Sequence, residues 1–83
     1  MKLFHFTAEW CNPCKKIKPI IAEYVIENPH IIYEQINVDD NPEIAKEYGI
    51  LSIPTLIAID DNADVIGRHT GVATKDQIRK LFK

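Results

Sequence analysis

Long apolar runs are missing from this sequence of 83 residues. No stretch approaches the ~20 consecutive apolar residues that a membrane-spanning helix needs. The apolar run at the N-terminus is broken by His5 and is too short for the apolar segment of a secretory signal peptide. We therefore expect a cytoplasmic chain with no membrane contact.

A surplus of positive charge is also missing. Ten Lys and Arg residues stand against twelve Asp and Glu residues, which gives a formal net charge of -2. Because binding to nucleic acid requires clustered cations that neutralise phosphates, we expect no nucleic-acid partner. The hydrophobic fraction of 46% and the charged fraction of 27% are those of an ordinary globular protein. The length predicts one domain over residues 1–83, which we expect to be monomeric.

Cysteine is scarce, with only Cys11 and Cys14 in the chain. Two cysteines are too few for the dense disulfide framework of small secreted proteins. A structural zinc needs about four ligands, but His5, His30 and His69 fall on separate expected elements, so we predict no metal-ligating residue within one chain. A metal that bridges two chains stays open. An inert disulfide between these cysteines would close a very short loop and stabilise the fold little, so the pair favours redox chemistry.

The pattern of the remaining residues predicts a small α/β protein. Apolar and β-branched runs indicate strands, amphipathic spacing indicates helices, and Pro19 is expected to kink the first helix without dividing it. Asn41 with Pro42 begins the second helix and Gly49 ends it, while Thr74 and Gln77 form a capping box. The expected elements are a strand at 3–6, a helix from 12 to about 27, a strand at 31–38, a helix between 41 and 49, an antiparallel hairpin of 55–59 with 64–69, and a last helix through Lys83.

The spacing Cys-x-x-Cys at a helix start carries the predicted chemistry. It places the sulfur of Cys11 at the exposed N-terminus of the helix and that of Cys14 about one turn further in, within bonding reach. Free backbone N–H groups and the helix dipole stabilise a thiolate on Cys11. Asn12 and Pro13 restrict the turn between the two cysteines. The nearby cations, which either tune the thiolate or form a plain solvated face, are Lys15, Lys16 and Lys18.

The segment FTAEWCNPCK, with INVDDNPEIAKEYGI and IPTL further on, resembles the thioredoxin family, and the likeness extends from Lys2 to Lys83. It implies the thioredoxin fold, β-α-β-α-β-β-α, with a four-stranded mixed sheet in the order 2-1-3-4 flanked by three helices. It also implies a cis bond before Pro54, and an Ile53 backbone that pairs with an extended substrate segment. Trp10 is either a core aromatic or the edge of the site, and the resemblance favours the edge. The implied substrate-binding surface consists of Trp10, Asn12, Pro13, Ile53, Pro54, Gly71 and Val72.

The chain departs from the family pattern in three places. It begins directly at the strand before the cysteines, so we expect a minimal, glutaredoxin-sized version. His5 stands where thioredoxins have a buried Asp, and Gln35 stands where they have its Lys partner. The family Asp assists the proton transfers of the second cysteine. For His5 two roles stay open: proton transfer for Cys14, or a neutral buried histidine satisfied by one hydrogen bond.

The resemblance implies an enzyme that reduces protein disulfides. Cys11 would be the nucleophile and Cys14 the resolving cysteine, so that the redox-active disulfide Cys11–Cys14 forms and is reduced in each cycle. It implies no bound cofactor, and electrons from NADPH delivered by a flavin-containing thioredoxin reductase. Two alternatives stay open. One is a glutaredoxin-like enzyme recharged by glutathione, and the other is a thioredoxin-fold subunit that only binds within a larger assembly.

Overall fold

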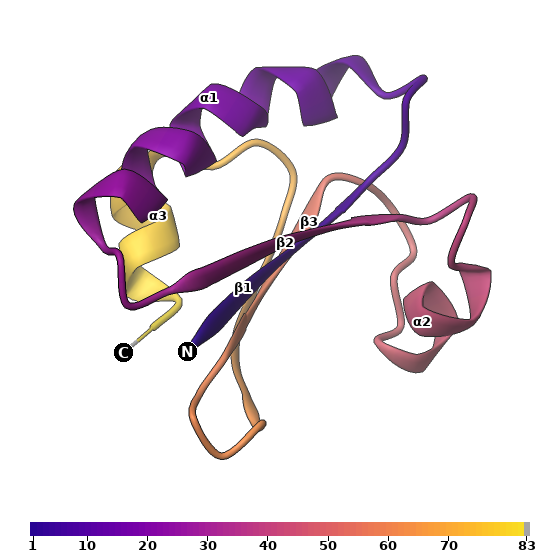
Figure 1. Cartoon of the computed structure of the whole chain (residues 1–83). Helices are drawn as coiled ribbons and strands as arrows, with labels where there is room; N and C mark the ends of the chain where they lie inside the picture. The colour runs from indigo at the N-terminus through magenta and orange to yellow at the C-terminus, as the bar shows by residue number, and fades with distance from the viewer. Residues whose placement is uncertain (83) are drawn as a thin grey trace.

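The computed structural model describes residues 1–82 and contains four strands and three helices in the expected order (Figure 1). The elements are β1 (Lys2–Thr7), α1 (Asn12–Glu27), β2 (Ile32–Asn37), α2 (Pro42–Glu47), β3 (Thr55–Ile59), β4 (Val65–Thr70) and α3 (Lys75–Lys80). Pro19 lies inside α1, which continues as one helix as predicted. Among the described residues, no helix combines the length and the apolar character needed to span a bilayer.

The end of the last helix differs from the prediction. α3 stops at Lys80, and the backbone N–H groups of Leu81 and Phe82 donate to carbonyls only three residues earlier. Such bonds tighten the chain into turns and close the helix. The prediction that the helix continues was therefore wrong for these two residues, and Lys83 lies outside the described residues.

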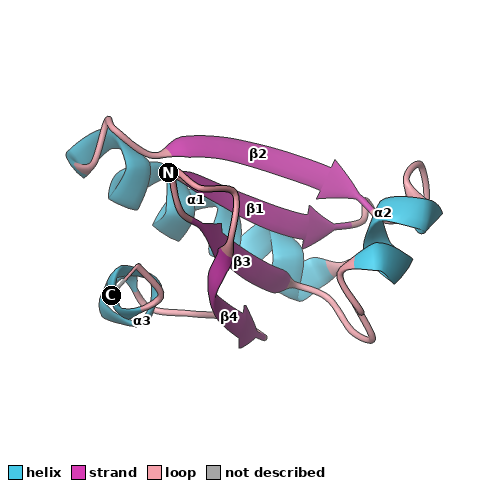
Figure 2. Ribbon diagram, turned by 90° about the horizontal axis from the view of Figure 1, so that it is seen from below, coloured by secondary structure: helices cyan, strands magenta, loops and turns pink. Residues whose placement is uncertain are grey.

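The four strands form one mixed sheet in the order β2-β1-β3-β4, which confirms the topology that the resemblance implied (Figure 2). β1 and β2 are parallel, with His5 opposite Gln35 and Leu3 opposite Tyr33. β3 runs antiparallel to both β1 and β4, and the β3–β4 pair is the expected hairpin. The central strand β1 therefore delivers the chain directly to the loop that carries the cysteines.

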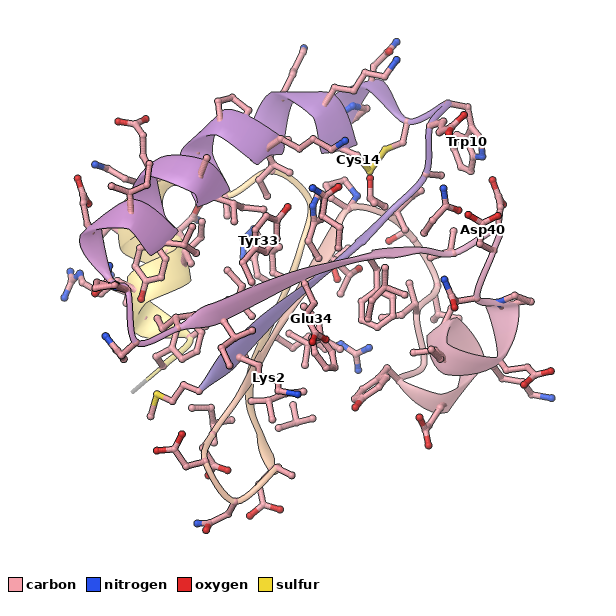
Figure 3. The ribbon with its side chains drawn as sticks, in the orientation of Figure 1. Lys2, Trp10, Cys14, Tyr33, Glu34 and Asp40 are labelled. Carbon is pink, nitrogen blue, oxygen red and sulfur yellow. A yellow bond between two sulfur atoms is a disulfide. The ribbon has the colours of Figure 1, made fainter. Side chains whose placement is uncertain are left out.

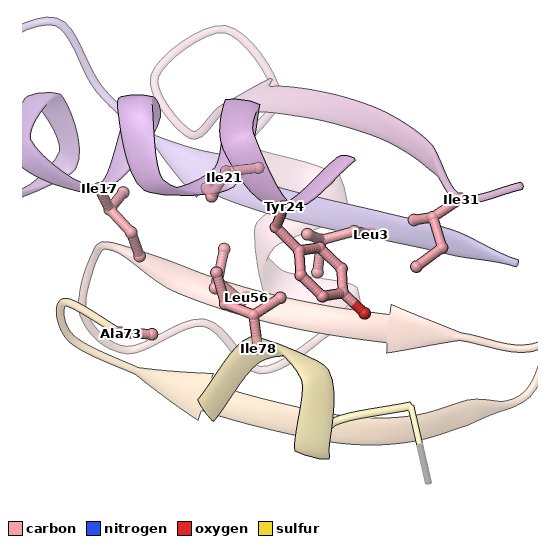
Figure 4. Close-up of a cluster of buried hydrophobic side chains, with 8 residues drawn as sticks. All are labelled: Leu3, Ile17, Ile21, Tyr24, Ile31, Leu56, Ala73 and Ile78. Atoms are coloured by element: carbon pink, nitrogen blue, oxygen red, sulfur yellow. The ribbon is translucent and has the colours of Figure 1, made fainter. Parts of the chain in front are cut away.

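Helices cover both faces of the sheet. On one face, apolar side chains of α1 and α3 pack on those of β1 and β3 (Figure 4); the buried members are Leu3, Ile17, Ile21, Tyr24, Ile31, Leu56, Ala73 and Ile78. On the other face, α2 contributes to a second cluster whose buried members are Phe6, Ala45, Ile57 and Ile59. Successive strand side chains point to opposite faces, so the near-continuous apolar β1 and β3 supply both clusters.

Candidate active site

The two cysteines lie where β1 has ended and α1 begins. Cys11 is the N-cap residue of α1, and its Sγ accepts a hydrogen bond of 3.2 Å from the backbone N–H of Cys14. The two side chains form a disulfide, visible as a yellow bond in Figure 3, with the Cα atoms 5.3 Å apart. The bonding reach that the spacing predicts is confirmed.

The exposure of Cys11 differs from the prediction. In this oxidised form only 4% of Cys11 and none of Cys14 is exposed. Cys11 packs with Ala8 and Cys14, and Val38 and Ile53 close the cluster from the other side. The prediction of an exposed first sulfur was therefore wrong for the disulfide form, because apolar residues of its own loop, of the loop after β2 and of the loop before β3 pack around it.

Trp10 forms the edge of the site. Its side chain is 67% exposed, and its Nε1–H donates a hydrogen bond of 2.8 Å to Oδ2 of Asp39 (Figure 3). A core position for this aromatic is thereby excluded. Asn12 and Pro13 occupy the first turn of α1 and are exposed beside it.

The loop before β3 supplies the opposite side of the site. The Ile53–Pro54 peptide bond is cis, as the resemblance implied, and Ile53 packs against the cysteine cluster. The carbonyl of Pro54 accepts a hydrogen bond of 2.8 Å from the N–H of Gly71, which has a φ of 98°. This bond holds Gly71 and the half-exposed Val72 next to Pro54, so the structure brings the expected surface residues of both loops together.

An apolar hollow lies beside Trp10 and went unrecognised in the sequence. It has a volume of about 370 Å³ and is lined by Trp10, Val38, Ala45, Ile50, Leu51, Ser52 and Ile53. Leu51 is 98% exposed at its rim. Leu51, an apolar residue in the short loop between Gly49 and Pro54, was the sequence signal for this hollow. An apolar side chain in such a loop is too far from the core to be buried there, so it is expected to form an exposed apolar surface.

His5 is buried in the sheet beneath α1 and makes one hydrogen bond. Its Nδ1 lies 3.1 Å from the hydroxyl oxygen of Tyr33, a partner that the sequence analysis missed. Burial, with a smaller contribution from the positive charge of Lys18, lowers the pKa of His5 from its usual 6.5 to about 4. The ring is therefore neutral at pH 7, a state that both roles left open for it require.

A polar hollow lies between the end of β1, the first turns of α1 and the end of β2. Its volume is about 490 Å³, and it is lined by Thr7, Ala8, Glu9, Lys15, Lys18, Gln35 and Asn37. Two of the three lysines at the start of α1 thus face this hollow. The third, Lys16, is exposed.

The histidines do not assemble with the cysteines into a metal site. His30 is exposed, and Nε2 of the half-buried His69 lies 3.3 Å from the carbonyl oxygen of Val72. Within residues 1–82, no three His, Cys, Asp or Glu side chains lie close enough to hold a metal ion.

A vicinal cysteine pair at a helix N-terminus, next to an apolar surface, is the arrangement of a thiol-disulfide oxidoreductase. The helix end stabilises a thiolate on the first cysteine once the bond is reduced, and the second cysteine is held within reach of the first. This is the class that the fold and the site define.

Comparison with known proteins supports the same class. The family model for thioredoxin matches residues 1–83. The thioredoxin of Chlamydia trachomatis serovar D is 39% identical over 80 residues, which cover 96% of this chain and 78% of the relative. The thioredoxin of Buchnera aphidicola subsp. Baizongia pistaciae is 40% identical over 81 residues, with 96% and 73% covered.

Among solved structures, oxidised mitochondrial thioredoxin 3 of Saccharomyces cerevisiae superposes with a TM-score of 0.87 at 29% identity. That match covers 95% of this chain and 73% of the yeast chain. The chain belongs to the thioredoxin family. It is a thiol-disulfide oxidoreductase whose redox-active pair is Cys11 and Cys14. Members of this family need no bound cofactor of their own, and membership implies protein disulfide substrates and a reductase partner.

Proposed function

We propose that this protein works mainly in the reducing direction, on disulfides of other proteins. The thiolate of Cys11 attacks one sulfur of the substrate disulfide and forms a mixed disulfide. Cys14 then attacks Cys11, and the substrate leaves reduced while the Cys11–Cys14 bond closes. The observation that supports this order is the position of Cys11 at the N-cap, where the helix end favours its anion, with Cys14 fully buried behind it.

The substrate-binding surface that we propose surrounds Cys11. Trp10 and Val72 supply exposed apolar area, and Ile53 offers its backbone to an extended substrate segment as an added strand. Asn12, Pro13, Pro54 and Gly71 complete this surface. We add Leu51, because the apolar hollow at its base is continuous with Ile53 and hence with the cysteine cluster.

Reduction of insulin tests the proposed function. With a dithiol as electron source, the native chain is expected to accelerate precipitation of the reduced insulin chains, and Cys11→Ser is expected to abolish that acceleration. Cys14→Ser is expected to accumulate a mixed disulfide with the substrate, which mass spectrometry detects. An active Cys11→Ser variant would favour the assembly-subunit alternative.

We propose that electrons reach the disulfide from NADPH through a flavin-containing thioredoxin reductase. Support comes from Trp10, which directly precedes Cys11 as in thioredoxins. Glutathione is the competing donor. Recharging rates measured with thioredoxin reductase plus NADPH and with glutathione separate the two, and faster recharging by glutathione would make the chain glutaredoxin-like.

We further propose a monomer of one domain that works in the cytoplasm, where thiol reductases are kept reduced. Its partners are then proteins with accessible disulfides and the reductase, with no nucleic acid or membrane partner. Size-exclusion chromatography of the reduced and oxidised chain tests the monomer, and a dimer in both states would contradict it.

A further inference from the structure

Nε2 of His5 has no hydrogen-bond partner, and it is the only buried side-chain nitrogen or oxygen within residues 1–82 for which this is so. Leaving a buried polar atom unpaired is unfavourable, so proteins keep few of them and often at functional places. The roles assigned to other residues above do not account for the unpaired Nε2 atom of His5. We therefore turn to the groups that surround it.

His5 lies between the core and the cysteines, on the face of the sheet that α1 covers. Leu3, two positions earlier on the same strand face, packs against Ile17 and Ile21. α1 runs back over β1 from the cysteine loop (Figure 1), and two strand residues advance about as far as four helical residues. His5 is therefore about one helical turn nearer to Cys14 than Leu3 is.

The ring of His5 is oriented by Tyr33. Their planes are nearly parallel at 18°, and the hydroxyl oxygen of Tyr33 is 3.1 Å from Nδ1. Tyr33 lies opposite Leu3 in the β1–β2 register, which is two residues further from the cysteine loop than His5, and packs against the core cluster beneath α1 (Figure 3). The two ring nitrogens of a histidine face diverging directions, so Nε2 is turned away from the hydroxyl of Tyr33.

The hydrogen bond also determines which ring nitrogen carries the proton. Burial raises the pKa of Tyr33 to about 12, so its hydroxyl remains protonated, while His5 is neutral and has a single ring proton. A phenol is the stronger donor of this pair and an imidazole nitrogen the stronger acceptor. Donation from Tyr33 to Nδ1 leaves the ring proton on Nε2.

We propose that Tyr33 is a positioning residue that holds neutral His5 with its proton on Nε2, and that this N–H donates a hydrogen bond to the Cys14 thiolate during resolution. This inference rests on the proposed role of Cys14 as the resolving cysteine. A hydrogen-bond donor at that place lowers the free energy of the buried Cys14 thiolate.

The bonds and protons of the step are as follows. The Cys14 thiol loses its proton to solvent, and its thiolate attacks Sγ of Cys11. The bond between Cys11 and the substrate sulfur breaks, and that sulfur leaves with the electron pair and takes a proton from solvent. The electrons for substrate reduction come from the two cysteines, and His5 keeps its proton throughout.

Few other titratable or charged groups face this pair. Lys18 of α1 and Tyr33 of β2 are the two that act on His5 or bond to it, whereas β3 contributes Leu56 and α3 contributes Ile78, both apolar. At the cysteine end the charged groups of the polar hollow are Glu9, Lys15 and Lys18. These cations also favour a thiolate, so they remain unchanged in every variant of the test.

A chromogenic aryl disulfide, dithiobis-nitrobenzoate, isolates the resolution step. In excess reagent, Cys11 forms a mixed disulfide and releases one coloured thiolate, and attack by Cys14 then releases the second in a unimolecular step. The pH dependence of that second rate reports the apparent pKa of Cys14. Because a hydrogen bond to a charged group amounts to about one to two pKa units, His5→Leu is expected to slow the step about tenfold or more at pH 7.

Two comparisons decide the chemistry. His5→Gln retains an N–H donor but has no basic nitrogen, so it is expected to keep most of the native rate of resolution. A rate as low as that of His5→Leu would mean that His5 acts as a base and would overturn the donor role.

The second comparison concerns Tyr33. Tyr33→Phe is expected to raise the apparent pKa of Cys14. Tyr24→Phe, which removes a hydroxyl from the same buried layer without contact to His5, is expected to leave it unchanged. The same apparent pKa of Cys14 in both Phe variants would show that Tyr33 does not position His5.

Nitrogen NMR of the native chain with labelled histidine gives a test that needs no variant. We expect the His5 resonances of the tautomer with the proton on Nε2 at neutral pH, and a loss of that preference in Tyr33→Phe. The opposite tautomer in the native chain would refute the proposal. None of these readouts uses a protein substrate, so failure to reduce insulin would contradict the proposed function while leaving this inference intact.

Discussion

His5 makes the stability of the fold depend on pH in a defined range. Its folded-state pKa of about 4 lies below the usual 6.5 because the buried ring cannot accept a charge without losing solvation. Between these two values the unfolded chain binds more protons than the folded chain does. The free energy of unfolding therefore falls as the pH is lowered from about 6.5 to about 4, and is unaffected by this group above that range.

We predict a decrease in the free energy of unfolding on the order of 3 kcal/mol across that range, from the size of the pKa difference. Urea unfolding at pH 4, 5, 6.5 and 7.5 measures it. His5→Leu is expected to remove most of the slope, and His30→Gln, at an exposed histidine, is expected to keep it. Asp61 and Asp76 have pKa values lowered below 3.8 and so titrate under this range. An unchanged slope in His5→Leu would show that another group causes it.

At the scale of elements, α3 depends on its cap. It has six residues, whereas isolated helices shorter than about 12–15 residues are marginal in water. The hydroxyl of Thr74 accepts a hydrogen bond from the N–H of Gln77, and the Gln77 side chain accepts one from the N–H of Thr74. This reciprocal motif gives two backbone N–H groups at the start of the helix a hydrogen-bond acceptor. The helix also buries Ile78 in the core cluster shared with α1.

We predict that Thr74→Ala lowers the free energy of unfolding by about 1 kcal/mol, because the N-cap acceptor is lost. Thermal or urea unfolding measures the loss. Thr74→Ser keeps a hydroxyl at the same place and is expected to retain most of the stability. If the Ser and Ala variants were equally destabilised, packing of the Thr methyl group rather than capping would be responsible.

α1 offers a second contrast within one helix. Ile17 is fully buried in the core cluster under the helix, while Ile26 on the outer face is 78% exposed. We predict that Ile17→Ala costs about 2–5 kcal/mol of unfolding free energy, as large-to-small substitutions in cores do. Ile26→Ala is expected to change it by less than about 0.5 kcal/mol. Similar losses at both positions would place Ile26 in a contact that the structure does not show.

At the scale of the whole molecule, apolar residues are exposed at both ends of the sheet, and only one end carries the disulfide. Leu51 lines the apolar hollow together with Trp10 and Ile53. Val65, which is 52% exposed, begins β4 after the hairpin turn, and that turn lies at the end of the sheet opposite to the start of α1 (Figure 1). Protein substrates must contact the end with Cys11. The two residues therefore form a matched pair for testing how partners dock.

We predict that Leu51→Ser lowers kcat/KM for insulin about fivefold, which corresponds to loss of about 1 kcal/mol of apolar contact with the bound protein. The rate with dithiobis-nitrobenzoate is expected to stay the same, since so small a disulfide does not reach the hollow. Val65→Ser is expected to alter neither rate. An equal decrease for insulin and for the aryl disulfide in Leu51→Ser would indicate a disturbed cysteine loop instead of lost docking.

Local sequence was sufficient for the elements, their order and the reactive pair. The capping box, Pro42 at a helix start, the β-branched runs and the Cys-x-x-Cys spacing all act within a few residues, so their consequences can be derived from neighbours in the chain. The strand order and the cis bond before Pro54 came from the family resemblance instead, because pairing partners such as His5 and Gln35 are far apart in sequence.

Only the tertiary structure decided how the site is enclosed. The burial of Cys11, the apolar hollow at Leu51 and the contact of Asp39 with Trp10 depend on loops that the sheet brings together from distant positions. The sequence by itself determined that a thiolate can form at the start of α1, because helix ends carry that property with them. Which side chains surround that sulfur, and which tyrosine orients His5, depends on packing between distant segments, and no local pattern encodes such contacts.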